Sequence, residues 1–178
     1  MMNEKEVILI RKQATPFKVN YPIDGRIKTY VWNGTRGKLL NKKSVPFEVY
    51  EWLSQYTTTF PEGCLIIDQT EDHEVNEIKG NIKNVDLAEK SVLTQEEIKE
   101  ILTSGNHLAL KSKLKNITDD MPEDIKNNQR RHIITVAREI GIDSSAKRRV
   151  LAEWANLDVE NSDLIFDKEL LEMYDKEE

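Results

Sequence analysis

The first 68 residues alternate short apolar runs with polar breaks, which is typical of β-strands. Three runs rich in β-branched and aromatic residues predict strands at 7–10, 17–21 and 27–32. Turn-forming residues follow at 22–25 and at Asn33-Gly34. Asn33-Gly34 is a hairpin signal because both residue types tolerate positive φ. Strands joined by tight turns predict an antiparallel sheet.

One helix and a closing strand complete this predicted domain. Ser44 is expected to cap the helix, with Pro46 in its first turn, where the missing N–H costs nothing. The residues on or near one face of this helix are Val45, Val49, Trp52 and Leu53. The apolar run 64–67 predicts the last strand, headed by Cys64. Residues 1–68 therefore form a small β-rich domain in this prediction.

Residues 69–93 lack a clear hydrophobic period. They hold six acidic residues, three lysines and scattered Val and Ile. Such a composition predicts an acidic linker or flexible arm.

Residues 94–158 show four amphipathic periods, each with helix-start or helix-stop residues. Thr94 and Glu97 have the spacing of a capping box, and Gly105 ends that helix. A second helix follows, Pro122 opens a third, and the fourth begins at residue 143 or 144. The whole pattern predicts an α+β chain, with an antiparallel β-rich N-terminal domain followed by a separate all-α four-helix domain.

Residues 159–178 combine eight acidic residues and two lysines with a short apolar cluster. The cluster consists of Leu164, Ile165, Phe166, Leu170, Leu171 and Tyr174. This acidic amphipathic tail either packs back onto the four helices or docks in the groove of a partner. The sequence leaves both hypotheses open.

Composition argues against a membrane-spanning, secreted or disulfide-bonded protein. The chain has a net charge of −6, and no apolar run approaches the roughly 20 residues of a membrane span. The N-terminus lacks the pattern of a signal peptide, so we expect the protein to stay in the cytoplasm where it is made. A single cysteine excludes an internal disulfide.

Candidate catalytic chemistry is sparse. The sequence has no nucleophile elbow, zinc-protease motif, Walker loop or dinucleotide fingerprint. The run 72–74 offers Asp, His and Glu, but adjacent residues cannot converge on one ion without a further ligand. His107 and His132 have no evident partner residue. We therefore expect a protein that is not an enzyme and needs no cofactor or metal.

The predicted helical domain carries basic clusters that could contact phosphates or a protein partner. They comprise Lys111, Lys113, Lys115, Arg130, Arg131, Arg138, Lys147, Arg148 and Arg149. Residues 94–158 also hold eleven acidic residues, so a solvated or protein-facing surface is favoured over nucleic-acid binding. Three cations at 147–149 oppose the dipole of the fourth helix, which indicates acidic partners from elsewhere, such as the tail.

Two segments resemble the small β domains of tailed-phage structural-cassette proteins: 28–34 (KTYVWNG) and 42–53 (KKSVPFEVYEWL). Residues 93–157 are similar to the helix-extended loop-helix modules that phage and prophage proteins append to such domains. Four helices and an acidic tail exceed one minimal module, which argues against carrying over its DNA contacts.

The resemblance implies a virion protein of the head, neck or connector region that is made in a bacterial host. Its implied partners are other virion proteins, including capsid or connector subunits. A homo-oligomer is a further candidate assembly, and nucleic acid is a candidate partner that is not favoured. A regulator of a host enzyme is another alternative. The aromatic candidates for partner contact are Tyr30, Trp32, Trp52 and Trp154.

Overall fold

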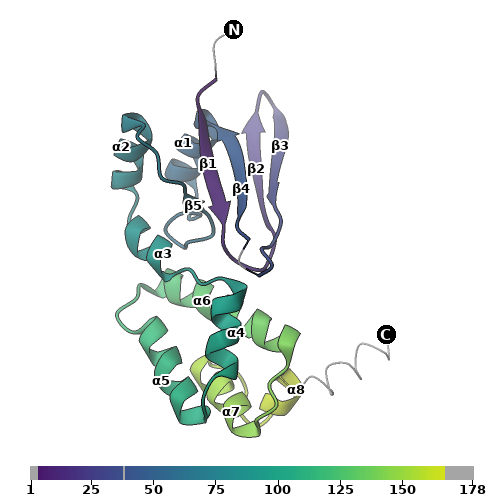
Figure 1. Cartoon of the computed structure of the whole chain (residues 1–178). Coiled ribbons are helices and arrows are strands. Elements are labelled where there is room, and N and C mark those ends of the chain that lie inside the picture. The colour runs from purple at the N-terminus through teal and green to yellow at the C-terminus, as the bar shows by residue number, and fades with distance from the viewer. Residues whose placement is uncertain (1–3, 38, 167–178) are drawn as a thin grey trace. The chain divides into compact units, whose positions relative to one another are not determined.

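The computed structural model describes residues 4–37 and 39–166, and the chain divides into two compact units, Met1–Thr94 and Gln95–Glu178 (Figure 1). The first unit contains β1 (Glu6–Arg11), β2 (Phe17–Ile23), β3 (Arg26–Trp32), β4 (Asn41–Pro46), α1 (Phe47–Tyr56), β5 (Ile66–Ile67), α2 (His73–Asn81) and α3 (Val85–Ser91). The second contains α4 (Gln95–Thr103), α5 (His107–Thr118), α6 (Glu123–Ile140), α7 (Ser145–Trp154) and α8 (Ser162–Phe166). The predicted α+β class is confirmed.

The strands form two antiparallel sheets. One sheet has the order β4-β1-β5, and the other is the β2-β3 hairpin. The hairpin turn lies at Asp24 and Gly25, whose φ angles of 48° and 71° are those of a primed turn. The hairpin predicted at Asn33-Gly34 is wrong. Gly34 instead lies against the backbone of Ala14, so close that a Cβ would fall 1.7 Å from the carbonyl oxygen.

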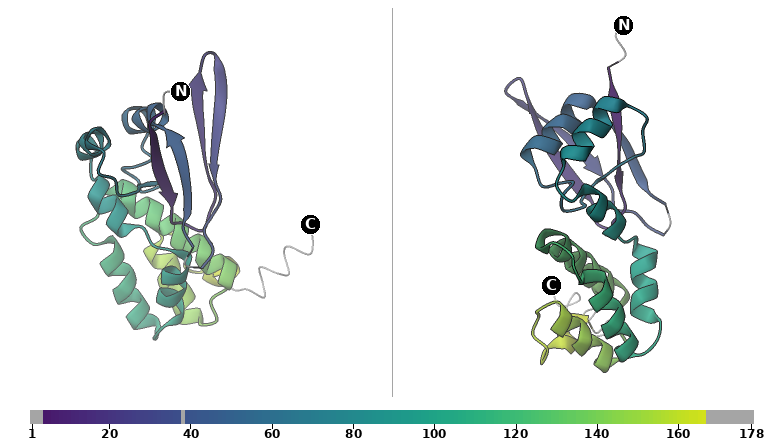
Figure 2. Two further views of the ribbon diagram at one scale, coloured as in Figure 1. Left: turned by 45° about the horizontal axis from the view of Figure 1, so that its top comes forward. Right: turned by 90° about the vertical axis from the view of Figure 1, so that its left-hand side faces the viewer.

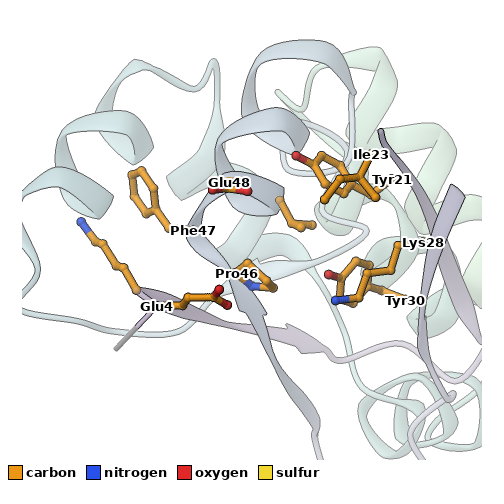
Figure 3. Close-up of a pocket in the computed structure, with 10 residues that line it drawn as sticks. Glu4, Tyr21, Ile23, Lys28, Tyr30, Pro46, Phe47 and Glu48 are labelled. Atoms are coloured by element: carbon orange, nitrogen blue, oxygen red, sulfur yellow. The ribbon is translucent and has the colours of Figure 1, made fainter. Parts of the chain in front are cut away.

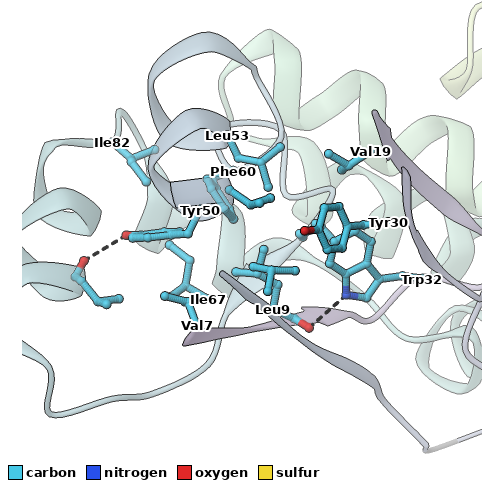
Figure 4. Packing of buried hydrophobic residues seen from close by; sticks show 14 of the residues in the cluster. Val7, Leu9, Val19, Tyr30, Trp32, Tyr50, Leu53, Phe60, Ile67 and Ile82 are labelled. Carbon is cyan, nitrogen blue, oxygen red and sulfur yellow. Dashed lines mark hydrogen bonds between the residues drawn. The ribbon is translucent and has the colours of Figure 1, made fainter. Parts of the chain in front are cut away.

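The core of the first unit lies between the strands and the helices (Figure 4). In the right-hand view of Figure 2, the helices of this unit lie in front of the strands. Trp32 is fully buried, and its indole N–H donates to the backbone carbonyl of Leu9 at 3.1 Å, which joins the hairpin to the central strand. The hydroxyl of Tyr50 on α1 donates to the carbonyl of Val75 on α2 at 2.9 Å. Burial raises the pKa of Tyr50 to about 12.

The start of α1 corrects the sequence prediction. Ser44 does not cap a helix but lies in β4, opposite Ile8, where its hydroxyl donates to Glu6 at 2.7 Å. The helix begins at Phe47, directly after Pro46. The strand β4 was not predicted because Asn41–Ser44 is wholly polar. The predicted last strand is shorter than expected, since Cys64 precedes β5.

The acidic linker predicted at 69–93 is also wrong, because this stretch folds into α2 and α3. The carboxylate of Asp72 accepts the backbone N–H groups of Glu74 and Val75 and so caps α2. Val75 of α2 and Val85 and Ala88 of α3 are buried in the first unit, and so are Ile82 and Val92, which directly follow the two helices. Asn84, with φ of 58°, separates the two short helices and breaks the period.

A carboxylate from α3 closes one edge of the three-stranded sheet. The backbone N–H of Ile67 in β5 donates to Oε1 of Glu89 at 3.1 Å. The other oxygen of Glu89 pairs with Lys79 of α2 at 2.8 Å. This contact satisfies a strand group that would otherwise face an unpaired edge.

The second unit confirms the four predicted helices and adds α8. On α6 the buried residues recur at helical spacing, at Ile125, Ile133, Val136 and Ala137 among others. Asn106 and Ser144 cap α5 and α7 with their side chains. The second unit thus has its own apolar core.

The first part of the predicted tail packs onto this unit. Phe166 of α8 is fully buried, and its carbonyl accepts the backbone N–H of Ile142 at 2.9 Å. The guanidinium of Arg148, which is itself buried, binds Asp163 at 2.7 Å and the carbonyls of Ile142 and Asp143. Arg148 of α7 therefore links α8 to the segment that precedes α7.

Candidate functional site

The first unit has a groove of about 390 Å³ between the hairpin and the start of α1 (Figure 3). Tyr21, Ile23, Lys28 and Tyr30 line it from β2 and β3. From the other side, the lining comes from the segment before β1, the end of β4 and the first turn of α1: Glu4, Lys5, Pro46, Phe47, Glu48 and Val49. The groove is thus rich in aromatic and aliphatic side chains, with charges of both signs.

The charge on one side of the groove is fixed by an ion-pair cluster. The ammonium of Lys5 lies 4.1 Å from the centre of the Phe47 ring and pairs with Asp72 at 2.8 Å and Glu74 at 2.6 Å. The hydrogen bonds that Lys5 donates to both carboxylates raise the pKa of Lys5, and its bond to Asp72 lowers the pKa of Asp72. Lys5 therefore holds the N-terminal end of α2 beside the groove.

Lys28 and the two glutamates provide the other charged groups of the groove. The ammonium of Lys28 lies 5.2 Å from the centre of the Tyr30 ring. No hydrogen-bonded pair of nucleophile and base occurs among the lining residues that the structure describes. The aromatic walls of the groove are suited to holding an apolar side chain.

The four aromatic candidates occupy different settings. Tyr30 and Trp32 are buried in the core. Trp52 is half-buried and packs edge-on against Tyr21 of the groove, with ring centres 5.6 Å apart. Trp154 is half-buried in the second unit, beside the guanidinium of Arg130.

Most of the predicted basic residues bond within the second unit. Lys111 pairs with Glu153 at 3.7 Å, Arg130 with Glu123 at 3.5 Å, and Arg149 with Glu160 at 3.6 Å. Lys113 donates to the hydroxyl of Ser104, Lys147 donates to the carbonyl of Leu102 at 3.0 Å, and Arg148 pairs with Asp163. Lys115 and Arg131 are exposed and form no ion pair within the described part of the chain. Six of the nine predicted cations therefore already have bonding partners within the second unit.

The acidic partners inferred for 147–149 come in part from the predicted tail, as Glu160 and Asp163. Of its apolar cluster, Phe166 is buried, Ile165 is half-buried and Leu164 is 45% exposed. Leu170, Leu171 and Tyr174 lie outside the described residues.

No group of three His, Cys, Asp or Glu side chains in 4–37 and 39–166 could hold a metal ion. Asp72 instead caps α2, and His73 is exposed beside Glu77 at 3.9 Å. None of the described helices is long and apolar enough to cross a membrane.

Sequence reasoning missed the groove. Its lining comes from residues near 4, 21, 28 and 46, which meet only when the hairpin folds against β4 and α1. The sequence feature that could have indicated the groove is the alternation that places Tyr21, Ile23, Lys28 and Tyr30 on one face of the hairpin.

Both units match models of known protein domains. Residues 5–84 match the model of the YonA N-terminal domain, and residues 94–161 match that of the YonA C-terminal domain. Comparisons with curated proteins and with solved structures find no match.

The chain therefore has the two-domain organisation of the YonA family, and these domains associate it with phage and prophage proteins. The N-terminal match runs through α2, which agrees with the folding of residues 73–81 as part of the first unit.

Proposed function

We propose that this chain is a non-enzymatic phage structural or assembly protein that binds a neighbouring virion subunit through the groove of its N-terminal unit. The groove carries the proposal, because its walls are aromatic and aliphatic and its charges include both lysines and glutamates. A concave apolar site with a few polar groups at its margin is typical of binding.

The partner is a head, neck or connector subunit that presents an apolar side chain to the groove. The phage association of the YonA domains and the sequence resemblance support this setting. A second set of contacts through the helical unit would let one chain join two neighbours. Tethered contacts of this kind gain from a high effective concentration.

Nucleic-acid binding is the alternative function, and the pairing of four predicted cations with carboxylates argues against it. Retention of the purified chain on DNA at low salt, lost steeply at moderate salt, would support this alternative. We expect no retention at low salt.

The experiment compares particles assembled with wild-type chain and with two matched variants. Ile23 lines the groove and is 40% exposed, whereas Ile27 of the same hairpin is 70% exposed and does not line it. Phage particles are purified after induction of the encoding prophage, and the chain is quantified in them by mass spectrometry. We expect Ile23→Lys to lower incorporation about tenfold or more, because a charge enters an apolar contact, and Ile27→Lys to leave it unchanged.

Absence of the wild-type chain from particles and from their assembly intermediates would overturn the proposed setting. Equal incorporation of wild type and Ile23→Lys would overturn the role of the groove.

A further inference from the structure

Helices α5 and α7 of the second unit pack together (Figure 1). Side chains of both helices line a pocket of about 230 Å³. Its lining comes from both helices and consists of Lys111, Lys115, Thr118, Val150, Glu153 and Trp154. Lys111, Lys115 and Trp154 are candidate contact residues in the sequence, where the two lysines lie far from the tryptophan. The fold brings them to one place.

The floor of the pocket presents mainly apolar atoms to a ligand, because the polar groups of Trp154 and Thr118 already bond within the unit. The indole N–H of Trp154 donates to the hydroxyl of Thr118 at 3.3 Å, and that hydroxyl donates to the carbonyl of Leu114 at 3.2 Å. The half-buried Trp154 ring and the side chain of Val150 remain for a ligand. A partly exposed tryptophan in a pocket is a common anchor for apolar side chains.

The rim of the pocket is cationic. Lys111 and Lys115 belong to the lining, and the guanidinium of Arg130 lies 6.0 Å from the centre of the Trp154 ring. Glu153 opposes them, paired with Lys111 at 3.7 Å, with both side chains more than 60% exposed. Arg130 is also paired, with Glu123 at 3.5 Å, so three cations face two carboxylates, and the rim keeps one net positive charge that attracts acidic ligands.

The ligand that fits this pocket is an acidic segment with apolar side chains. The chain holds such a segment at 167–178, with six acidic residues, two lysines and the apolar side chains of Leu170, Leu171, Met173 and Tyr174. The described chain ends at Phe166, whose backbone bonds to Ile142, just before the start of α7.

The length of this segment allows it to reach the pocket in the same molecule. The pocket lies toward the other end of α7, at Val150 and Trp154. The whole of α7 rises roughly 15 Å, and twelve residues span up to about 40 Å when extended. Attachment at Phe166 also gives the segment a high effective concentration.

We propose that residues 167–178 bind in the α5–α7 pocket of their own chain, with apolar side chains against Trp154 and acidic groups beside Lys111, Lys115 and Arg130. The site thus recognises acidic amphipathic segments. This inference does not rest on a virion role, because its test uses the purified chain alone.

The test follows the indole N–H signal of Trp154 in NMR spectra of the full chain, assigned with a Trp154→Phe variant. The double substitution Leu170→Ser and Leu171→Ser should shift this signal and leave those of Trp32 and Trp52 in place. A synthetic peptide of residues 167–178, added to the double variant, should return it. Adding Lys115→Glu to the double variant should weaken peptide binding about tenfold or more, because it reverses a rim charge.

Lys113→Glu, added to the double variant, is the matched control, because Lys113 lies on the same helix, bonds to Ser104 and does not line the pocket. Its effect on peptide binding should be under about twofold, as expected of a surface charge outside the site. An unmoved Trp154 signal in the double variant, or equal weakening by both lysine substitutions, would overturn the proposal. Sedimentation that shows a wild-type dimer, dissociated by the double substitution, would overturn binding within one chain and assign the pocket to the segment of a second copy.

Discussion

At the scale of single residues, the close approach of Gly34 to Ala14 leaves no room for a side chain. We expect Gly34→Ala to lower the free energy of unfolding by about 3 kcal/mol, because backbone atoms must move to admit the methyl group. Urea unfolding of the chain measures this change. Gly80→Ala is the control, since Gly80 is in α2 with nothing within 4 Å of its added Cβ, and it should be neutral or stabilising by up to about 1 kcal/mol.

An unchanged unfolding midpoint in Gly34→Ala would contradict the packing of residues 33–35 against the loop after β1. That packing includes the hydroxyl of Thr35, which donates to the carbonyl of Lys12 at 2.5 Å.

At the scale of elements, α2 depends on Asp72 for both its cap and its ion pair with Lys5. The pKa of Asp72 is lowered in the folded chain from its ordinary value of 3.8, chiefly by Lys5. A carboxylate with a lowered folded pKa adds stability above its unfolded pKa, and this contribution is lost as the pH falls through the folded value. Asn at this position can still cap the helix but carries no charge.

We therefore expect Asp72→Asn to be less stable than wild type by a constant amount above about pH 5, with the difference shrinking from about pH 4 downward. Unfolding midpoints measured between pH 3 and pH 7 test this. Asp72→Ala should cost more than Asp72→Asn at every pH, because it removes the cap as well. A wild-type advantage that persists undiminished at pH 3 would contradict the assigned ion pair.

The elements also show how far the sequence could predict this fold. β1 and the hairpin strands were predictable because their β-branched residues alternate or cluster, and the helices of the second unit because their apolar residues recur at helical spacing. β4 was hidden because Lys42, Lys43 and Ser44 occupy a strand at the edge of the sheet, where polar residues are tolerated. Helices α2 and α3 were hidden because each is short and buries few side chains.

Candidate sites were less predictable than elements, for a physical reason. Lys111, Lys115 and Trp154 each stood out in the sequence, but their meeting depends on how α5 packs on α7. The groove depends in the same way on the hairpin folding against β4 and α1. Sequence periods report which face of an element is buried and carry no information on which faces meet.

At the scale of the whole molecule, each unit has a buried core of its own, around Trp32 in the first and around Leu114 and Leu151 in the second. Both units exceed the about 40 residues below which a domain usually needs metals or disulfides. We expect fragments 1–94 and 95–178 to fold separately, each with a cooperative thermal transition followed by circular dichroism. A fragment without such a transition would contradict this independence.

The contact between Glu89 and Ile67 limits how the N-terminal unit can self-associate. A fibre that grows by adding strands needs two open edges on each sheet, one for each neighbour. In the three-stranded sheet, the negative carboxylate already occupies the N–H of β5, so an incoming strand meets a satisfied donor and a charge there. Strand addition to this sheet is therefore directed to β4, which favours a closed pair over a fibre built from this sheet.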